Sequence, residues 1–339
     1  MWDSLISSQL SQQSDSRAKS ISPIEKSLSE KIRTGLKNPS KFISGARRTV
    51  GKRENRLLGV DLIDEDWDNL LILDACRYDI FEQLNTIPGT LESRRSSGSA
   101  TLEFVRNNFA NRSCHEIVYV TANPYVSLVA DGVFHEHVPL WRTDWDDDLS
   151  TVRPESVARA VRDAASKHPD KRLVGHFAQP HHPFIGSYGR ERIDEAGNVK
   201  ARKEALGEAP PDDCTDVWSL VESGKIGHNT VVRAYEENLE LALSVVRDLV
   251  DDLEGKTVIT SDHGNLFDEP AYPVVKWGSH RYAHPMHATA EPLVKIPWLI
   301  CPYENRRSIT ADPPVDADRS VINVSTIEDR LSDLGYTEF

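Results

Sequence analysis

An aspartate and a histidine stand side by side directly after a short β-branched run at residues 257–260. Such runs favour buried strands, and in open α/β sheets ligands bind beyond the carboxyl ends of the strands. Asp262 and His263 can both reach one cation if the chain turns sharply after them, and Gly264 permits such a turn. The pair is therefore either a set of metal ligands or an Asx turn beside a surface histidine, and the rest of the chain must supply further ligands.

Two more side chains lie at comparable positions. Residues 69–74 read NLLILD, an apolar run typical of a central parallel strand, and Asp74 follows it at the turn into a helix predicted over 75–85. A small-residue loop, SSGSAT at 96–101, leads into another predicted helix. Thr101 would lie near the N-terminus of that helix, where free N–H groups favour an oxyanion or phosphate. Thr101 could also serve only as an N-cap, and Ser97 and Ser99 are the alternative nucleophiles.

The elements that position these side chains alternate between strands and helices. The remaining predicted strands are 116–121, 172–177 and 295–301, and the main helices are 152–167 and 231–253. The long helix directly precedes the strand before Asp262, which favours a parallel crossover connection. We predict an α/β fold with a mostly parallel central sheet flanked by helices on both faces. Residues 186–228 are polar and aperiodic, and we predict that they form a lid insertion over the site.

Composition indicates one large soluble domain with appendages. The chain has 339 residues, 39% of them hydrophobic, and a mean hydropathy of -0.47 without an apolar run of membrane-spanning length. The first residues do not show a basic stretch followed by an apolar one, so we expect no signal peptide. The cysteines are scattered without CxxC spacing, which favours reduced thiols and a cytoplasmic protein, with membrane association through its N-terminal arm as an extension of that prediction.

The charge is unevenly distributed along the chain. Residues 1–56 hold 12 Lys and Arg against 5 Asp and Glu, whereas the remainder holds 28 against 48. Ile24, Leu28, Ile32 and Leu36 recur every four residues among basic residues, which predicts a basic amphipathic helix within a helical arm that is disordered at its start. This arm either docks through residues 24–56 on an anionic membrane surface or packs on the acidic body. We expect no nucleic-acid partner for the acidic body.

Several motifs together resemble a known family. NLLILDACRYD (69–79), SSGSATLEF (96–104), PHHPF (180–184), TSDHG (260–264) and KIPWLI (295–300) occur in the order seen in the alkaline phosphatase superfamily. They look most like its sulfatase-like and phosphoglycerol-transferase-like branches. The resemblance covers roughly residues 66–335, including the tail EDRLSDLGY, which we predict to lie in a helix over 325–335. It implies a sulfatase-like catalytic domain over residues 57–339 behind the arm.

The resemblance also implies a metal centre and a covalent mechanism. One divalent cation would be bound, and a threonine activated by it would attack the ester. Two carboxylates, a hydroxyl and an imidazole favour Mn²⁺ or Mg²⁺, and Zn²⁺ also fits. The implied residues are Asp74, Thr101, Asp262 and His263 as metal ligands, Thr101 as nucleophile, His182 and His284 as catalytic histidines, and Arg77 and His181 as substrate-binding residues.

The sequence departs from the family pattern in three places. Ala75 follows Asp74 where sulfatases usually have a second acid. Cys76 is not followed by the pattern that formylglycine formation needs, so we expect a buried structural thiol, with a cysteine nucleophile as the rival interpretation. Gly224 stands four residues before His228, where two-metal members have an aspartate, so a second metal site is not expected. Among the later histidines we prefer His284 over His280 and His287 as the one at the site.

We therefore predict a metal-dependent hydrolase or transferase that acts on a phosphate ester or phosphodiester. Its substrate would be a small-molecule, lipid-linked or glycan-linked anionic ester. The alternatives are a sulfatase-type sulfuric ester hydrolase without formylglycine, and a catalytically silent binding module that is tethered to a membrane.

Overall fold

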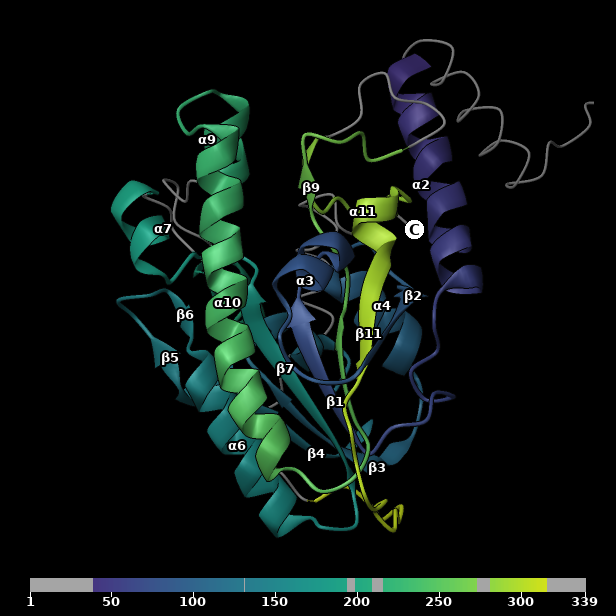
Figure 1. Ribbon diagram of the computed structural model, residues 1–339. Coiled ribbons are helices and arrows are strands. Elements are labelled where there is room, and N and C mark those ends of the chain that lie inside the picture. Colours follow the sequence, from purple (N-terminus) through teal and green to yellow (C-terminus); the bar gives the residue numbers. More distant parts are fainter. Residues whose placement is uncertain (1–38, 131, 194–198, 209–215, 273–280, 316–339) are drawn as a thin grey trace, which may run out of the picture. The chain divides into compact units, whose positions relative to one another are not determined.

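The computed structural model describes residues 39–130, 132–193, 199–208, 216–272 and 281–315 (Figure 1). The chain divides into two compact units, Met1–Ala46 and Arg47–Phe339. The described part of the first unit is the beginning of helix α2 (Pro39–Leu58), and everything below concerns the second unit. The predicted helices at 24–36 and 325–335, and His280, lie outside the described residues. Among the described residues, no helix is both long and apolar enough to span a membrane.

A seven-stranded sheet forms the centre of the second unit (Figure 1). In spatial order its strands are β2 (Thr90–Arg95), β11 (Lys295–Ile300), β8 (Thr257–Ser261), β1 (Asn69–Asp74), β7 (Arg172–Pro180), β3 (Cys114–Thr121) and β4 (Phe134–Pro139). The five strands from β8 to β4 pair in parallel, whereas β11 is antiparallel to both β8 and β2. The prediction of a mostly parallel central sheet is thus confirmed.

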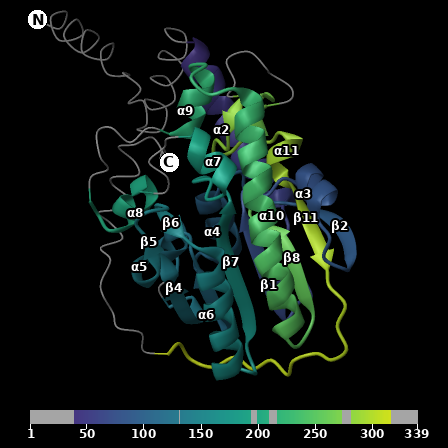
Figure 2. The ribbon, with the colours of Figure 1, turned by 60° about the vertical axis from the view of Figure 1, so that its left-hand side comes forward.

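Helices cover both faces of the sheet, as predicted (Figure 2). The side chains of β1 alternate between the two faces, because successive residues of a strand point in opposite directions. Leu71 and Leu73 share a core with α3 (Tyr78–Leu84), α6 (Pro154–Lys167) and α10 (His228–Asp252). Leu70 and Ile72 share the opposite core with α4 (Thr101–Phe109) and Trp298. A strand that is buried on both faces explains the unbroken apolar run before Asp74.

Short elements connect this framework. They are η1 (Pro124–Leu128), α5 (Leu140–Thr143), β5 (Trp145–Asp146), β6 (Thr151–Val152), α7 (Ser187–Arg192), α8 (Val199–Ala205), α9 (Val217–Glu222), β9 (Leu266–Phe267), β10 (Tyr282–Ala283) and α11 (Glu291–Val294). The described parts of the 186–228 insertion are therefore partly helical, whereas the sequence had suggested an aperiodic segment. Its role as a lid stays a prediction.

Helix α3 begins at Tyr78, three residues later than predicted. Ala75 has a left-handed backbone with a φ of 57°, which ends the strand in a tight turn and cannot continue into a right-handed helix. Asp74 therefore lies at a turn of its own, separated from the helix by three residues.

Candidate active site

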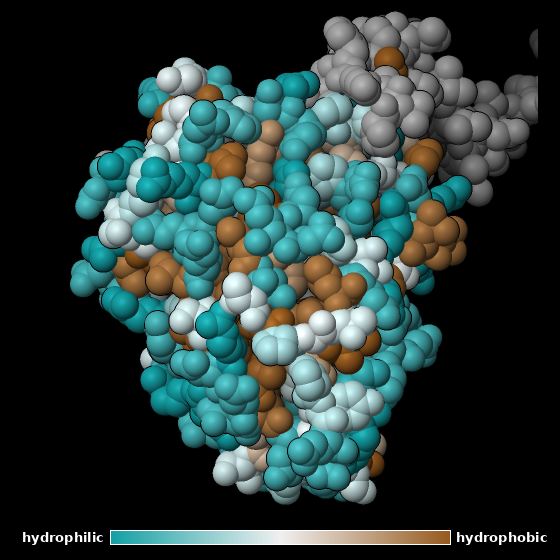
Figure 3. Space-filling view, viewed as in Figure 1, coloured by the Kyte–Doolittle hydropathy of each residue, from teal (hydrophilic) through white to brown (hydrophobic). Residues whose placement is uncertain are grey.

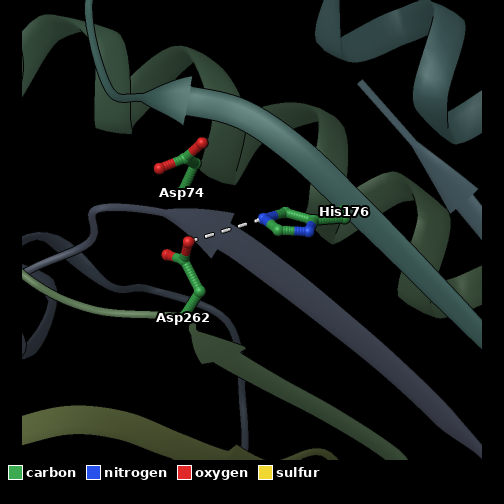
Figure 4. A group of neighbouring side chains, drawn as sticks. All are labelled: Asp74, His176 and Asp262. Carbon is green, nitrogen blue, oxygen red and sulfur yellow. Dashed lines mark ion pairs between the residues drawn. The ribbon is translucent and has the colours of Figure 1, made fainter. Parts of the chain in front are cut away.

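Four polar side chains meet near the carboxyl ends of neighbouring strands, because the strands that bear or precede them run parallel. Asp74 ends β1, Asp262 follows β8, Asn123 lies two residues beyond β3, and His176 lies within β7. Figure 4 shows Asp74 beside His176 and Asp262, which face each other across the dashed line. All four residues are buried, with exposed fractions between 0% for Asp262 and 8% for Asn123.

The two oxygens of Asp262 have different surroundings. Oδ1 accepts the backbone N–H groups of Ala75 at 3.0 Å and His263 at 2.8 Å. Oδ2 is buried without a hydrogen-bond partner, 3.3 Å from His263 Nε2 and 3.8 Å from His176 Nε2. One oxygen thus fixes the side chain, and the other is presented to the site.

Asp74 is divided in the same way. Asn123 donates from Nδ2 to Asp74 Oδ2 at 2.6 Å, whereas Asp74 Oδ1 is buried without a hydrogen-bond partner, 3.7 Å from His263 Nε2. Burial, and after it the charge of Asp262, raise the pKa of Asp74 well above its ordinary value. Two carboxylates in a dry site repel each other, and a cation between them would relieve that repulsion.

Two histidines, His176 of this group and the adjoining His263, are suited to ligation. His263 Nδ1 lies 2.7 Å from the carbonyl oxygen of Gly264, which can only accept, so Nδ1 carries the proton and Nε2 presents a lone pair. His176 Nδ1 lies 3.0 Å from the Tyr119 hydroxyl, and its Nε2 is buried without a hydrogen-bond partner. Burial lowers the pKa of His176 to about 4 against the opposing charge of Asp262, so the ring is neutral at neutral pH.

These donors fit a divalent cation. One ligand atom from each of Asp74, His176 and Asp262 lies within 4.8 Å of the others. Three of these buried atoms lack any hydrogen-bond partner, although buried polar groups are almost always paired in native proteins. A bound cation would satisfy all three. His263 Nε2, at 3.3 Å from Asp262 and 3.7 Å from Asp74, is a further donor to the same position.

Thr101 reaches the same group. It is the first residue of α4, and the N-cap is Ala100, so Thr101 does not take the N-cap position. Its Oγ1 lies 3.3 Å from His263 Nε2 and accepts from Asn123 Nδ2 at 3.3 Å. The Asn123 amide is oriented by Tyr125, whose backbone N–H donates to Oδ1 at 2.9 Å. The Thr101 hydroxyl therefore lies next to the imidazole of His263. Its role as the nucleophile stays a prediction.

The competing nucleophiles are held by other contacts. Asn108 donates to Ser97 Oγ at 2.7 Å, and Ser99 Oγ donates to the carbonyl of Pro285 at 2.8 Å. Cys76 is a buried free thiol, and burial followed by the charge of Asp262 raises its pKa well above the ordinary value. Such a thiol is not a thiolate at neutral pH, which disfavours the cysteine mechanism.

Three further histidines gather beside the group. His181 Nε2 lies 2.9 Å from His284 Nε2, and the His284 ring lies 4.6 Å from the His263 ring, centroid to centroid. His182 stacks on His181 at 4.3 Å, and its Nε2 lies 3.9 Å from Asp216 Oδ1. The structure thus brings together the histidines from PHHPF and from the segment before the last strand. Their catalytic and substrate-binding roles stay predictions.

Arg77 is engaged by acidic side chains. Its guanidinium bonds Asp79 at 2.7 Å and Glu269 at 2.8 Å and lies 5.3 Å from the centre of the Phe267 ring. Its charge is thus neutralised within the protein. The prediction that Arg77 contacts a substrate anion stays a prediction and would require one of these ion pairs to open.

Sequence reasoning missed His176 and Asn123. The signal for His176 was a lone histidine inside an apolar strand, RLVGHFAQP. Asn123 carried a weaker signal, a polar residue just past the end of a strand. The structure gives a reason for Gly264 other than the predicted turn: a Cβ there would lie 1.9 Å from the carbonyl oxygen of Pro292, so close packing requires the glycine.

No protein-family model and no curated protein sequence matches this chain. Solved structures that resemble it include the periplasmic domain of a phosphoethanolamine transferase from Campylobacter jejuni (12% identity, 68% of this chain and 77% of that chain, TM-score 0.40). They also include a 2-O GAG sulfatase (13%, 73% and 66%, TM-score 0.39) and a lipoteichoic acid synthase from Listeria monocytogenes (9%, 78% and 72%, TM-score 0.35). These likenesses concern the fold alone. The identities and TM-scores are low, and the roles of individual residues rest on the geometry above.

Proposed function

We propose that this protein is a metal-dependent hydrolase or transferase of phosphate esters or phosphodiesters, with Thr101 as its nucleophile. The observation that carries the proposal is the position of the Thr101 hydroxyl, 3.3 Å from His263 Nε2 and beside three buried ligand atoms without hydrogen-bond partners. A hydroxyl placed against such a group is the arrangement that activates a weak nucleophile.

Asp74, His176, Asp262 and His263 would hold the cation. When bound, the cation would lower the pKa of the Thr101 hydroxyl and stabilise negative charge on the ester oxygens. Two imidazoles beside two carboxylates suit Zn²⁺ or Mn²⁺ better than Mg²⁺, because imidazole is a softer ligand than a carboxylate or water. The sequence, with one imidazole, favoured Mn²⁺ or Mg²⁺. The second imidazole, from His176, makes Mg²⁺ less suitable and Zn²⁺ more suitable.

The chain's own residues would carry out a two-step transfer. Asn123 holds Thr101 Oγ1 in place by donating to it and to Asp74 at once. Thr101 Oγ1 would give its proton to solvent water as it bonds to phosphorus, the bond from phosphorus to the leaving oxygen would break, and His182 would supply a proton to that oxygen. His284 would orient the substrate, because burial lowers its pKa well below the ordinary value and keeps the ring neutral. Water or an acceptor hydroxyl then attacks the phosphothreonine and releases Thr101; water gives hydrolysis and an alcohol gives transfer.

A phosphate or phosphodiester is favoured over a sulfate because the chain lacks the cysteine pattern for formylglycine and offers a threonine instead. We also propose a cytoplasmic location. It is supported by the three described cysteines, Cys76, Cys114 and Cys301, which are free and buried.

The test is turnover of p-nitrophenyl phosphate, bis-p-nitrophenyl phosphate and p-nitrophenyl sulfate by the purified full chain, with and without added Zn²⁺, Mn²⁺ or Mg²⁺. Thr101→Ala should lower metal-dependent turnover by roughly 10³-fold or more while the protein still binds metal. Ser97→Ala and Ser99→Ala are the matched controls and should keep most of the activity. Intact-mass analysis of wild-type protein quenched during turnover should reveal a phosphorylated species that Thr101→Ala lacks.

Metal-dependent turnover that survives in Thr101→Ala would contradict the assigned nucleophile. Absence of turnover with every ester and metal would favour the silent binding module. Faster turnover of the sulfate than of both phosphates would favour the sulfatase alternative.

A further inference from the structure

Helix α2 has two distinct faces over its length from Arg47 to Leu58. The inward face packs closely on the body: a Cβ at Gly51 would lie 1.8 Å from the carbonyl oxygen of His287. The buried Asn55 donates from Nδ2 to the carbonyl of Ala288 at 3.0 Å and to Glu103 at 3.3 Å. This part of the predicted arm therefore belongs to the folded body.

The same helix also exposes three large apolar side chains over this length. Val50, Leu57 and Leu58 have exposed fractions of 62%, 79% and 62%, which are the largest among the large hydrophobic residues that the structure describes. Val50 and Leu57 are seven residues apart, which places them on one side of the helix, two turns apart. Hydrophobic side chains lie over the lower part of α2 at the right of Figure 3. Exposed apolar residues that gather on one helix mark an interaction site more often than scattered ones do.

Three basic residues adjoin these apolar ones. Lys52, Arg53 and Arg56 are exposed, and within the described part of the chain no ion pair is found for any of them. The chain from residue 57 onward carries 28 Lys and Arg against 48 Asp and Glu, so this helix is a cationic surface on an anionic protein. We call Val50, Lys52, Arg53, Arg56 and Leu57 the α2 outer face. Leu58, the last residue of the helix, is on the side of Gly51 but is 62% exposed, and we count it with this face.

We propose that the α2 outer face binds the surface of an anionic lipid bilayer. Basic side chains beside protruding aliphatic ones are the chemistry of helices that lie in the membrane interface, where cations contact lipid phosphates and aliphatic groups enter the acyl boundary. The two interpretations of the arm are thus compatible, because one face of α2 packs on the body while the other meets the membrane.

A second copy of the chain fits this face less well. A symmetric pair formed through α2 would bring Lys52, Arg53 and Arg56 against the same cations of the partner. A pair formed with another surface would need apolar residues there. Among the described residues of the second unit, the other exposed large hydrophobics are Leu206, Leu241, Tyr303 and Val315, which lie on separate segments.

The test is co-sedimentation of the full chain with vesicles of phosphatidylglycerol and phosphatidylcholine, compared with vesicles of phosphatidylcholine alone. We expect binding to the anionic vesicles only, and weaker binding as salt is raised, because salt screens surface charges. Substitutions are preferable to deleting residues 1–56, because that deletion would also remove the buried contacts of Asn55 and Gly51 with the body.

The basic variant, Lys52→Gln with Arg53→Gln and Arg56→Gln, should weaken vesicle binding about 100-fold, since each basic residue near the surface contributes roughly 1 kcal/mol. The apolar variant, Val50→Ser with Leu57→Ser and Leu58→Ser, should weaken binding by at least about 100-fold. Arg159→Gln with Arg162→Gln and Lys167→Gln on α6 is the charge-matched control, and Leu241→Ser with Val315→Ser is the control for lost apolar residues. Both controls should bind as the wild type does.

The proposal is overturned if the wild type does not sediment with anionic vesicles, if either α2 variant binds as tightly as the wild type, or if a control loses as much affinity. A wild type that is dimeric in light scattering and becomes monomeric in the apolar variant would assign the face to a second copy instead. Turnover of a soluble ester should not change in any variant, so failure of this proposal is distinguishable from failure of the proposed reaction.

Discussion

The position of the Asp262 carboxylate depends on the backbone of Ala75, the residue that follows the neighbouring strand β1. Ala75 adopts a left-handed backbone, φ 57°, which costs an alanine roughly 1–2 kcal/mol. In return its N–H points at Asp262 Oδ1, and its carbonyl accepts the Tyr235 hydroxyl at 2.8 Å. The Ser261 hydroxyl joins the same two strand ends, because it donates to Leu73 O and accepts from Cys76 N. The strained turn thus holds the two acids at a fixed separation.

We predict that His176 is a metal ligand. His176→Ala should lower the affinity for Zn²⁺ or Mn²⁺ by at least about 10–100-fold, since even the partners that orient ligands have effects of that size. Isothermal titration of the metal-free protein measures the change. His137→Ala is the matched control, because His137 also has a buried Nε2 without a hydrogen-bond partner but lies on β4, outside the group of ligand atoms. Equal affinities of His176→Ala and the wild type would remove His176 from the site.

The residues of the site differ in how far the sequence could reveal them. Asp74, Asp262 and His263 stand at the ends of apolar strands, where a polar residue signals a strand tip. His176 does not, since it sits inside β7 opposite Ile72 of β1, and it comes beside Asp262 only because β1 pairs with both β7 and β8. Asn123 reaches Asp74 through the turn after β3, a contact between residues far apart in the sequence. Local patterns carry no information about such contacts.

At the scale of elements, Glu103 connects α4 with α2 and with the segment before the last strand. The carboxylate is buried and accepts from Ser99 N at 3.0 Å, His287 N at 3.0 Å and Asn55 Nδ2 at 3.3 Å, and it is paired with His287 Nδ1 at 2.9 Å. Burial works to raise the pKa of Glu103, but the hydrogen bonds and charge of His287 lower it overall. Glu103, two residues after the start of α4, thus anchors this helix to α2 and to His287.

We predict that Asn55 stabilises this junction. Asn55→Ala should lower the free energy of unfolding by about 1–3 kcal/mol, because the buried carbonyl of Ala288 loses its donor and Glu103 loses one of its donors. Asn55→Asp keeps the shape but places a second carboxylate beside Glu103, so it should lower the free energy further at neutral pH. Urea denaturation of the three proteins measures both effects. An Asn55→Asp variant as stable as the wild type would show that the junction is looser than described.

At the scale of the whole molecule, the alternation of apolar runs with amphipathic helices was enough to predict a mostly parallel sheet covered on both faces. Two strands of the seven-stranded sheet, β2 and β4, were not predicted. β2 has the sequence TLESRR and lies at an edge of the sheet with its side chains exposed or half-buried, so it lacks the apolar signal of a strand. The reversed direction of β11 was not predicted either. Leu293, just before β11, accepts from the backbone N–H of Gly264 at 2.8 Å, so the chain enters β11 beside the carboxyl end of β8 and runs back along it.

Buried neutral histidines should make the whole molecule sensitive to acid, and His137 allows this to be tested away from the site. The residue is partly exposed, but its Nε2 is buried, and burial together with the nearby Arg142 charge lowers its pKa to about 4. An unfolded histidine titrates near 6.5, so between roughly pH 6.5 and 4 the unfolded chain binds more protons and the free energy of unfolding falls as pH falls. At pH 5 this should lower the free energy by about 2 kcal/mol relative to pH 7.5.

His137→Gln should lose that part of the pH dependence, whatever its effect at pH 7.5. Because His176 and Asp74 also titrate, the quantity to measure by urea denaturation is the difference between wild type and variant at the two pH values. The same loss of stability in both proteins on going to pH 5 would show that His137 can take up its proton without unfolding.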